Sequence, residues 1–433
     1  MPPRLGWADL RGARVAVWGL GVEGRASIER LLALGVEPAL VDDAPREATV
    51  CGLPVQRTDD GGLDRLRQAE VVVKSPGISR YRDDVRALVD AGVAVVGGLG
   101  LWLEDVDRSR VVLVTGTKGK STTTSIIGHL LRGLGRDCFV GGNIGAPPFA
   151  LDAGADHDTW VIEVSSYQAT DLTSAPPVIA VTSLNPDHLN WHADSVEQYY
   201  RDKLSICRLP GARVTVADGT SDELRARRDL LGPEVRWVEP PADPERAWSR
   251  ALGLRGEHNL RNAELARCVL EELGVDAAHD DERLAELSNG FTPLPSRLTT
   301  VGVVGGVEFI DDSLSTNVLP TCAAVRSFPQ RPLVLVVGGF DRGIDYAPLA
   351  AVLSEREART LVVGIPDNGS RIIDELRAVG VPAHVETAVV DSIESAVRTG
   401  HEWLRDDGVV LLSPAAASYG RYGSYRERSE AFV

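Results

Sequence analysis

Lysine is rare in this sequence, and the few lysines lie where their chemistry could matter. Of the 46 lysines and arginines, only four are lysines: Lys74, Lys118, Lys120 and Lys203. Arginine always carries its charge on a planar fork of donors, whereas lysine is a compact charge that can lose its proton when buried. We therefore expect lysine where arginine cannot replace it. Two of the four fall in Val-Thr-Gly-Thr-Lys-Gly-Lys-Ser-Thr, residues 114–122, which is typical of a loop that binds phosphate.

The segment 114–122 has the features of a phosphate-binding turn. An apolar run predicts a strand that breaks at Gly116, and an amphipathic helix follows directly. The N–H groups of such a turn and the N-terminus of its helix attract phosphate oxygens. Lys120 would reach the β- and γ-phosphates of ATP, and the hydroxyl of Ser121 or Thr122 would bind Mg²⁺. One glycine of the usual motif is missing, so the alternative is a glycine-rich turn without a ligand.

Acidic and imidazole side chains lie at the ends of two further predicted strands. Glu163 closes an apolar run, and His188 follows Asn-Pro-Asp after the next run. Because the carboxyl ends of parallel strands meet at one edge of a sheet, Gly116, Glu163 and His188 should converge. Glu163 and Ser121 would supply oxygen ligands for one Mg²⁺. His188 is a less usual magnesium ligand, and the alternative for it is a structural histidine.

Lys203 lies on a predicted helix, residues 196–207, just past these groups. An ammonium beside a metal cation is unfavourable unless the amine is neutral. A neutral lysine can take up CO₂ and become a carbamate, whose anionic oxygens can bind a metal ion. The alternative is a solvated lysine on the surface of the helix.

The composition favours a globular protein and disfavours nucleic-acid and membrane proteins. Hydrophobic residues make up 43% of the 433 residues and charged residues 25%, which predicts packed domains. The net charge of −16 argues against a general nucleic-acid binder, and no apolar run reaches the roughly 18 residues of a membrane span. The five cysteines are scattered, as in a reduced cytosolic protein. We expect a cytoplasmic monomer that binds neither nucleic acid nor membranes.

Short Val/Ile/Leu runs alternate with amphipathic stretches, which predicts an α/β fold with parallel sheets. The length exceeds that of one ordinary domain. We expect three domains, at residues 1–108, 109–298 and 299–433, with the proline-rich segment 292–297 as a candidate hinge. The predicted strands are 14–18, 38–41, 71–73, 111–115, 160–164, 179–183, 307–310, 333–337, 360–363 and 408–412.

With these residues assembled, the sequence resembles the Mur ligases of peptidoglycan synthesis over essentially its whole length, and among them the glutamate-adding members. The phosphate loop with one glycine fewer is the form that this family uses. The matching segments occur in the family's order: 116–122, Gly-Asn-Ile-Gly at 142–145, Glu-Val-Ser-Ser-Tyr-Gln at 163–168, Asn-Pro-Asp-His at 185–188, Tyr-Arg-Asp-Lys-Leu at 200–204, Gly-Glu-His-Asn-Leu-Arg-Asn-Ala at 256–263, and in the C-terminal part 312–313, 316–317, 338–339 and 413–415.

The resemblance implies a ligase with a Rossmann-like UDP-binding domain, a central P-loop ATPase-type sheet and a Rossmann-like C-terminal domain. ATP would phosphorylate the terminal carboxylate of UDP-N-acetylmuramoyl-L-alanine, and the amine of glutamate would attack the acyl phosphate. Two Mg²⁺ and Lys120 would stabilise the negative charge that collects there. By the resemblance, Ser121 and Glu163 hold one Mg²⁺, and His188 and carbamylated Lys203 hold the second. The residues implied to contact ATP are Gly116, Thr117, Lys118, Gly119, Lys120, Ser121, Thr122, Asn259, Asn262, Arg297 and Asp312.

Gly-Leu-Gly-Val-Glu-Gly at residues 19–24 follows a predicted strand and opens a helix, with two aspartates about 20 residues further on. Alone, this pattern predicts dinucleotide binding and a dehydrogenase. No acid/base and hydride-acceptor residues accompany it, so the resemblance assigns it to the UDP moiety. We expect Lys74 nearby to be a solvated charge at a strand end, with an extra phosphate contact as the alternative. The implied UDP-substrate residues are Gly19, Leu20, Gly21, Asp42, Asp43, Ser75, Gly77 and Asn143.

The resemblance places the glutamate site in the C-terminal domain. Arg342 stands where the family commonly has a lysine, and Leu314 stands where the D-glutamate enzymes usually have one. Changed cations around a chiral dicarboxylate change which enantiomer fits, and Gly-Val-Glu-Gly-Arg at 21–25 is similar to the branch that uses L-glutamate. We expect L-glutamate, with D-glutamate as the alternative. The implied glutamate-binding residues are Thr316, Arg342, Ser418 and Tyr425.

One rival enzyme class is the folylpolyglutamate synthases, which share the ATP core and also add glutamate. They lack a separate N-terminal UDP-binding domain, whereas residues 1–108 here form one βαβ set. This rival and the nicotinamide dehydrogenases are therefore disfavoured.

Overall fold

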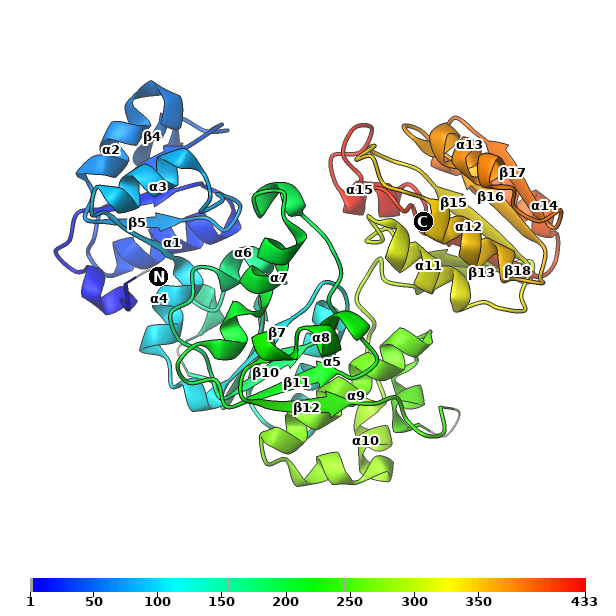
Figure 1. Ribbon diagram of the computed structural model, residues 1–433, viewed down its shortest axis with the longest axis horizontal. Helices are drawn as coiled ribbons and strands as arrows, with labels where there is room; N and C mark the ends of the chain where they lie inside the picture. The colour runs from blue at the N-terminus through cyan, green and yellow to red at the C-terminus, as the bar shows by residue number, and fades with distance from the viewer. Residues whose placement is uncertain (1–2, 155, 245–246) are drawn as a thin grey trace. The chain divides into compact units, whose positions relative to one another are not determined.

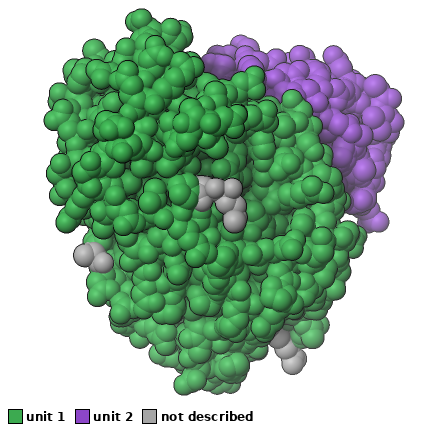
Figure 2. Space-filling model, turned by 60° about the vertical axis from the view of Figure 1, so that its left-hand side comes forward, with its two compact units in different colours: residues 1–252, 261–291 green, residues 253–260, 292–433 purple. Residues whose placement is uncertain are grey.

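A computed structural model describes residues 3–154, 156–244 and 247–433. In these residues, helices flank three six-stranded sheets, so the predicted α/β fold class is confirmed (Figure 1). The chain divides into two compact units, which Figure 2 colours separately. Unit 1 comprises residues 1–252 and 261–291 and holds the first two sheets; unit 2 comprises residues 253–260 and 292–433 and holds the third. The domain limits at residues 108 and 298 stay a prediction.

The first sheet has the order β3-β4-β2-β1-β5-β6 and is parallel except for the antiparallel pair β3-β4. Each parallel step needs a crossover, which accounts for the helices between the strands. The elements are β1 Val15–Trp18, α1 Val22–Ala33, β2 Ala39–Asp42, β3 Thr49–Val50, β4 Leu53–Arg57, α2 Leu63–Gln68, β5 Val71–Lys74, α3 Asp83–Asp90, β6 Ala94–Gly97 and α4 Gly98–Asp105.

The second sheet has the order β12-β11-β10-β7-β9-β8, with every pair parallel. Its central strands are mostly apolar because helices cover both faces. The elements are β7 Val111–Thr115, α5 Lys120–Gly133, β8 Cys138–Gly142, β9 Thr159–Glu163, α6 Ser166–Ala169, β10 Val178–Val181, α7 Val196–Leu204, β11 Val214–Asp218, α8 Asp222–Ala226, β12 Glu234–Val238, α9 Glu257–Glu272 and α10 Asp281–Ser288.

The third sheet has the order β13-β14-β18-β15-β16-β17 and is parallel except for the antiparallel pair β13-β14. The loops that leave β14, β15 and β18 therefore open at the same edge. The elements are β13 Thr299–Val304, β14 Val307–Asp311, α11 Val318–Arg326, β15 Leu333–Val337, α12 Ala347–Ser354, β16 Thr360–Gly364, α13 Gly369–Val379, β17 Val385–Val389, α14 Ile393–Leu404, β18 Gly408–Leu412 and α15 Tyr425–Glu430.

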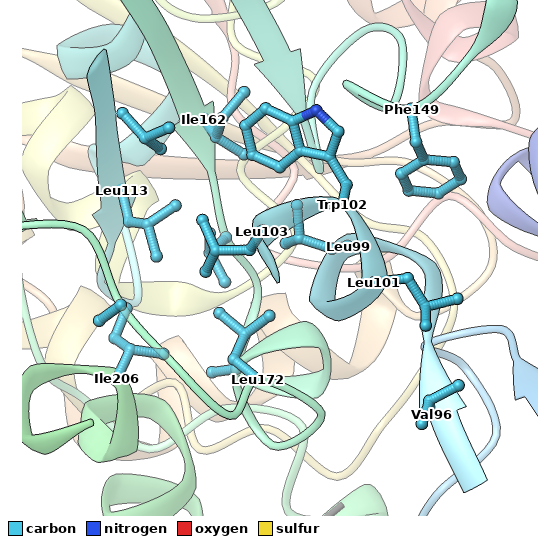
Figure 3. Close-up of a cluster of buried hydrophobic side chains, with 14 of the residues drawn as sticks. Val96, Leu99, Leu101, Trp102, Leu103, Leu113, Phe149, Ile162, Leu172 and Ile206 are labelled. Atoms are coloured by element: carbon cyan, nitrogen blue, oxygen red, sulfur yellow. The ribbon is translucent and has the colours of Figure 1, made fainter. Parts of the chain in front are cut away.

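One hydrophobic core runs from the first sheet into the second. Leu99, Leu101, Trp102 and Leu103 of α4 are buried in it, together with strand residues of both sheets (Figure 3). The indole of Trp102 packs edge-on against that of Trp160 on β9, with 5.1 Å between the ring centroids. Burial on this scale, at about 25 cal/mol per Å² of apolar surface, explains why the two sheets form one compact unit.

Lys74 contradicts the prediction of a solvated charge. It ends β5, is 2% exposed, and its Nζ lies 2.5 Å from Oδ2 of Asp171. Asp171 follows α6 in the second sheet's part of the chain, so this buried ion pair ties the two sheets together. The prediction was wrong because α6 and the segment after it cover the end of β5. The sequence does not reveal this contact between residues 97 positions apart.

Replacing Lys74 with Met should destabilise unit 1, because a buried Asp171 would lose its partner. Breaking a buried pair costs roughly 3–5 kcal/mol, whereas replacing both partners with apolar residues is often neutral. We expect Lys74→Met to lower the free energy of unfolding by about 3 kcal/mol, and the added Asp171→Leu to recover most of it in denaturant titrations. Arg67 pairs with Asp64 at the surface, so Arg67→Met should cost less than about 1 kcal/mol. Equal losses at the two pairs would contradict this account.

Candidate functional site

The predicted phosphate loop follows β7, which lies between β10 and β9 in the second sheet. Gly116 and Gly119 have φ values of +134° and +91°, in the region that glycine favours. A Cβ on Gly116 would collide with the Thr182 hydroxyl after β10, and one on Gly119 with the Asn262 amide on α9. The glycines therefore allow the loop to pass close beneath both neighbours.

Backbone and side-chain hydrogen bonds hold this loop against the segment after β10. The amide of Thr117 donates to the Ser183 carbonyl at 2.8 Å, and the amide of Lys118 donates to Ser183 Oγ at 2.9 Å. The Thr117 hydroxyl donates to the Asn185 carbonyl at 3.0 Å. The predicted convergence of the two strand ends is confirmed. The loop is therefore shaped before any phosphate arrives, which lowers the entropic cost of binding.

Lys120 and Ser121 begin α5, the helix that follows the loop. The ammonium of Lys120 donates to the carbonyls of Gly116 and Thr117 at 3.0 and 3.1 Å. Ser121 is buried, and Thr122 is half-buried. A lysine curled over the loop lies close enough to exchange these carbonyls for phosphate oxygens, which are stronger acceptors because they are charged.

Glu163 ends β9 beside the loop strand, where Val114 is its partner in the ladder. Its side chain is 2% exposed, and Asn143 donates through Nδ2 to Oε1 at 2.6 Å. The other oxygen, Oε2, is buried and has no hydrogen-bond partner among the described residues. A buried carboxylate oxygen without a partner is costly unless it meets a cation or donor. Glu163 is therefore suited to the role of a metal ligand. Asn143, which was predicted to contact UDP, lies beside Glu163 and not with the other predicted UDP contacts.

No group of three or more His, Cys, Asp or Glu in residues 3–154, 156–244 and 247–433 could hold a metal ion. A Mg²⁺ site at this edge would therefore need hydroxyl, phosphate or water oxygens beside Glu163. Ser121 supplies a hydroxyl of that kind.

His188 adopts a left-handed backbone conformation, with φ +51°, directly before the short helical turn Leu189–Trp191. Its side chain is 48% exposed, and Nε2 lies 3.7 Å from Oδ1 of Asp187. Lys118 lies 3.4 Å from the other oxygen of Asp187. Burial opposes ionisation of Asp187, but the charges of Lys118 and His188 outweigh it and hold the pKa of Asp187 below its usual value. The motif contained Asp187, but the sequence did not single it out as a site residue.

Lys203 is buried on α7, with an exposed fraction of 2%. Its Nζ donates to the Gly116 carbonyl at 3.0 Å and lies over the ring of Tyr199. Burial, followed by the charge of Lys120, lowers the pKa of Lys203 well below its ordinary value. The solvated-lysine alternative is therefore excluded, and the amine points at the phosphate loop.

A buried polar network that the sequence did not predict surrounds Asp202, the residue before Lys203. Asp202 accepts hydrogen bonds from Tyr81 at 2.7 Å and from Gln198 at 2.8 Å, and its other oxygen lies 2.6 Å from Nδ1 of His192. Nε2 of His192 lies 3.0 Å from Ser166 Oγ. Tyr81 lies in the loop after β5 of the first sheet, so the network connects this loop to α7, the helix that carries Lys203.

The residues predicted to contact UDP lie mainly where β1, β2 and β5 end. The amide of Leu20, between Gly19 and Gly21, donates to Oδ2 of Asp42 at 2.7 Å. Ser75 donates to the Gly19 carbonyl at 2.6 Å, and the exposed Gly77 follows two residues later. Asp43 accepts from Thr58 at 2.6 Å and pairs with Arg82. The structure thus gathers these loops at one edge of the first sheet.

Glu23, inside the glycine motif, is a further acidic group that the sequence did not single out. Gln168 donates to its Oε1 at 2.6 Å, and Gln168 in turn caps α6, which follows Glu163. Burial raises the pKa of Glu23 to about 7, with Asp171 nearby adding to the effect. This carboxyl therefore changes its charge near neutral pH.

The remaining residues predicted to contact ATP are divided between the units. Asn262 lies in unit 1, against Gly119. Asn259, Arg297 and Asp312 lie in unit 2, and Asn259 donates through Nδ2 to the Arg255 carbonyl at 2.7 Å. Burial raises the pKa of Asp312 to about 7, although the Ser315 and Ser413 hydroxyls donate to it.

The residues predicted to bind glutamate all lie in unit 2, in segments after β14, β15 and β18. Thr316 is half-buried, Ser418 is buried, and Tyr425 begins α15. Arg342 is exposed, with its guanidinium over the ring of Tyr419 at 5.7 Å. Because these segments leave parallel strands at one edge, they form one cluster of loops.

Three family models match the chain in sequence order: the MurD-like N-terminal domain of Mur ligases at residues 13–97, the Mur ligase middle domain at 114–235, and the Mur ligase glutamate ligase domain at 296–416. A relative from Micromonospora sp. named UDP-N-acetylmuramoyl-L-alanine--L-glutamate ligase is 42% identical, covering 98% of this chain and 97% of the relative. A relative of the same name from Salinispora tropica is 39% identical, covering 98% of this chain and 98% of the relative. Another from Xanthomonas axonopodis is 35% identical, covering 98% of this chain and 95% of the relative.

Solved structures share the fold at low identity. MurC from Thermotoga maritima matches with a TM-score of 0.57 and 19% identity, covering 97% of this chain and 98% of that chain. MurF from the same organism, in complex with ADP, matches with a TM-score of 0.58 and 16% identity, covering 99% and 96%.

None of the described helices is long and apolar enough to cross a bilayer.

Replacing Glu23 with Gln should stabilise unit 1 increasingly as the pH rises. The folded-state pKa of about 7 exceeds the ordinary value of 4.5 for an exposed glutamate, so the unfolded chain loses this proton first and wild-type stability falls between these two pH values. Below pH 4.5 and above pH 7 the contribution is constant. We expect the stability difference between Glu23→Gln and wild type to grow by roughly 2 kcal/mol from pH 4.5 to pH 8, measured by chemical unfolding. A difference that does not change with pH would contradict the raised pKa.

Proposed function

This chain belongs to the Mur ligase family, and we propose that it joins L-glutamate to the terminal carboxylate of UDP-N-acetylmuramoyl-L-alanine while ATP is converted to ADP and phosphate. The observation that carries the proposal is the cluster at the edge of the second sheet. There, the phosphate loop, Lys120 and the unpartnered oxygen of Glu163 come from neighbouring parallel strands. The relatives' names supply the substrates.

The proposed reaction suits these groups. A carboxylate is a poor electrophile, so ATP first converts it to an acyl phosphate, and the glutamate amine then displaces the phosphate to form the amide. Carboxylate, phosphate and the developing negative charge meet in this step. Lys120, once its ammonium exchanges the Gly116 and Thr117 carbonyls for phosphate oxygens, and the N-terminus of α5 would stabilise that charge.

We propose Ser121 and Glu163 as protein ligands of one Mg²⁺, and His188 and carbamylated Lys203 as ligands of a second. The buried Glu163 oxygen without a partner fits this role. Bound there, Mg²⁺ would neutralise phosphate charge. Lys203 supports the carbamate proposal in two ways: its amine is buried beside the loop, and burial lowers its pKa, which favours the neutral amine that reacts with CO₂.

The remaining assignments are extensions of the same proposal. The loops after β1, β2 and β5 would hold UDP, Asn262 with Asn259, Arg297 and Asp312 would contact the nucleotide of ATP, and the loops of unit 2 that carry Thr316, Arg342, Ser418 and Tyr425 would hold glutamate. The chain would act as a monomer, with domain limits near residues 108 and 298.

L-glutamate is favoured over D-glutamate by two observations. The relatives that cover nearly the whole chain are named for L-glutamate. Leu314 and Arg342 also change the positive charges expected around the D-amino acid. A folylpolyglutamate synthase is disfavoured because residues 13–97 match a MurD-like N-terminal domain. The same match disfavours a nicotinamide dehydrogenase.

The proposal is tested by phosphate release from ATP and Mg²⁺ with UDP-N-acetylmuramoyl-L-alanine, comparing L- and D-glutamate. We expect turnover with L-glutamate to exceed that with D-glutamate at least roughly 100-fold, because a site that pairs with both carboxylates cannot do so for the mirror image. Lys120→Met and chelation of Mg²⁺ should each abolish release. Turnover with D-glutamate alone would reverse the enantiomer. No turnover with either, together with activity on a folate acceptor, would overturn the function.

Lys203→Ala should lose activity at least about 100-fold, and a short carboxylic acid such as formate should restore part of it by replacing the carbamate oxygens. The matched control is Lys74→Ala, since Lys74 is equally buried but paired with Asp171. No acid should rescue that variant. Full activity of Lys203→Ala, or equal rescue of both variants, would contradict the carbamate. A ¹³C carbamate signal in labelled bicarbonate should be present in wild type and absent from Lys203→Ala.

A further inference from the structure

Three loops of unit 2 leave the carboxyl ends of β14, β15 and β18 and carry residues proposed to bind glutamate. Backbone hydrogen bonds already join two of them: the amide of Gly338 donates to the Pro414 carbonyl at 2.9 Å, and the amide of Phe340 donates to the Ala417 carbonyl at 2.8 Å. In this chain, one side chain contacts all three.

That side chain is Arg428 of α15, which is fully buried. Its guanidinium donates to the carbonyl of Ser313 after β14 at 2.8 Å, to that of Gly338 after β15 at 3.5 Å, and to that of Ala416 after β18 at 3.1 Å. The backbone makes room for it: Gly339 has φ +147°, and a Cβ there would lie 2.9 Å from Nη1 of Arg428.

No carboxylate among the residues that the structure describes lies within ion-pair distance of Arg428. Asp311, a nearby acid, instead accepts hydrogen bonds from Ser313 and Ser429. Nε of Arg428 is buried without a partner. Burial lowers the pKa of Arg428 to about 10, which still leaves it charged at neutral pH. The negative charge of Asp311 offsets part of this shift, but the guanidinium makes its hydrogen bonds to carbonyls, so it can still attract an anion bound nearby.

We propose that Arg428 is a positioning residue for the amino-acid substrate, which sets the three loops relative to one another and places a buried positive charge behind the site for a dicarboxylate. This inference rests on the proposed glutamate ligase function.

Each carbonyl that Arg428 binds lies a few residues before a proposed glutamate contact. Ser313 precedes Thr316, Gly338 precedes Arg342, and Ala416 precedes Ser418. Tyr425, the fourth proposed contact, lies one helical turn before Arg428 on α15. Removing the guanidinium would therefore loosen all four contacts at once. The phosphate loop and the proposed UDP contacts belong to unit 1, whereas Arg428 belongs to unit 2.

The same unit contains a matched control, Arg356. It is 6% exposed and donates to the carbonyls of Val325, Phe328 and Arg331. These carbonyls precede β15, so Arg356 lies at the amino ends of the strands, one strand length (roughly 15 Å) from the loops that Arg428 binds. Both arginines are buried forks on three carbonyls, but they lie at opposite ends of the sheet, and Nε of Arg356 also donates to the Thr360 hydroxyl at 3.0 Å.

The test compares steady-state kinetics of Arg428→Met and Arg356→Met with each of the three substrates varied in turn. Met keeps much of the length of Arg but lacks its donors and charge. We expect Arg428→Met to raise KM for glutamate about tenfold or more, as loss of charge-assisted hydrogen bonds would, with KM for ATP and for the nucleotide sugar within about twofold of wild type. Arg356→Met should lower the thermal midpoint but leave all three KM values within about twofold.

Arg428→Lys keeps the positive charge but lacks the forked donors of the guanidinium. This variant replaces Arg428→Met in the test if Arg428→Met does not fold. It should raise KM for glutamate about threefold. A wild-type KM for glutamate in either folded Arg428 variant overturns the inference. So does an equal rise for all three substrates, or the same glutamate-selective rise in Arg356→Met. Wild-type protein without glutamate turnover would overturn the proposed function itself, which is a separate outcome.

Discussion

The apolar side chains of α4, packed between the first two sheets, are the constraint on which the rest of unit 1 depends (Figure 3). They exclude water along the junction, and only then can a pair such as Lys74 and Asp171 persist with 2.5 Å between its charged atoms. The hydrogen bonds from Tyr81 to Asp202 and from Gln168 to Glu23 cross the same junction. Loops from both sheets therefore keep fixed relative positions, which a site for a nucleotide sugar and ATP requires.

Three buried cations show three ways of tolerating a charge in a protein interior. Lys74 is neutralised by a carboxylate, and its role is structural. Lys203 has a carbonyl and an aromatic ring, and burial favours its neutral form, which prepares the amine for chemistry. Arg428 keeps its charge because a guanidinium is very hard to deprotonate, and it disperses that charge over three carbonyls. Lysine or arginine at each position therefore fits what the side chain does there: it forms an ion pair at 74, favours a neutral amine at 203, and keeps its charge at 428.

The sequence predicted the fold far better at the centre of the sheets than at their edges. All ten predicted strands are present, and their ends differ by two residues or fewer. Among the residues that the structure describes, eight further strands were missed, and six of them are sheet edges. In an edge strand such as β12, Glu-Val-Arg-Trp-Val, apolar and charged residues alternate because one side of the strand meets water. Such a strand lacks the continuous apolar run that marks a buried parallel strand. In the candidate site, Gly116, Lys120, Glu163 and Lys203 could be proposed from the sequence because a motif or a strand end marks each one.

By itself, the sequence determined the α/β class, the order of the motifs and the edge of the second sheet where the chemistry gathers. These follow from local periodicity and from the rule that parallel strands end together. Only the tertiary structure decided that Lys74 is buried, that Glu23 has a pKa near 7, that Asp202 is held by Tyr81 and His192, and that Arg428 joins three loops. Each depends on burial or on a partner distant in sequence. Such contacts leave no local pattern, because packing of the folded chain alone brings the partners together.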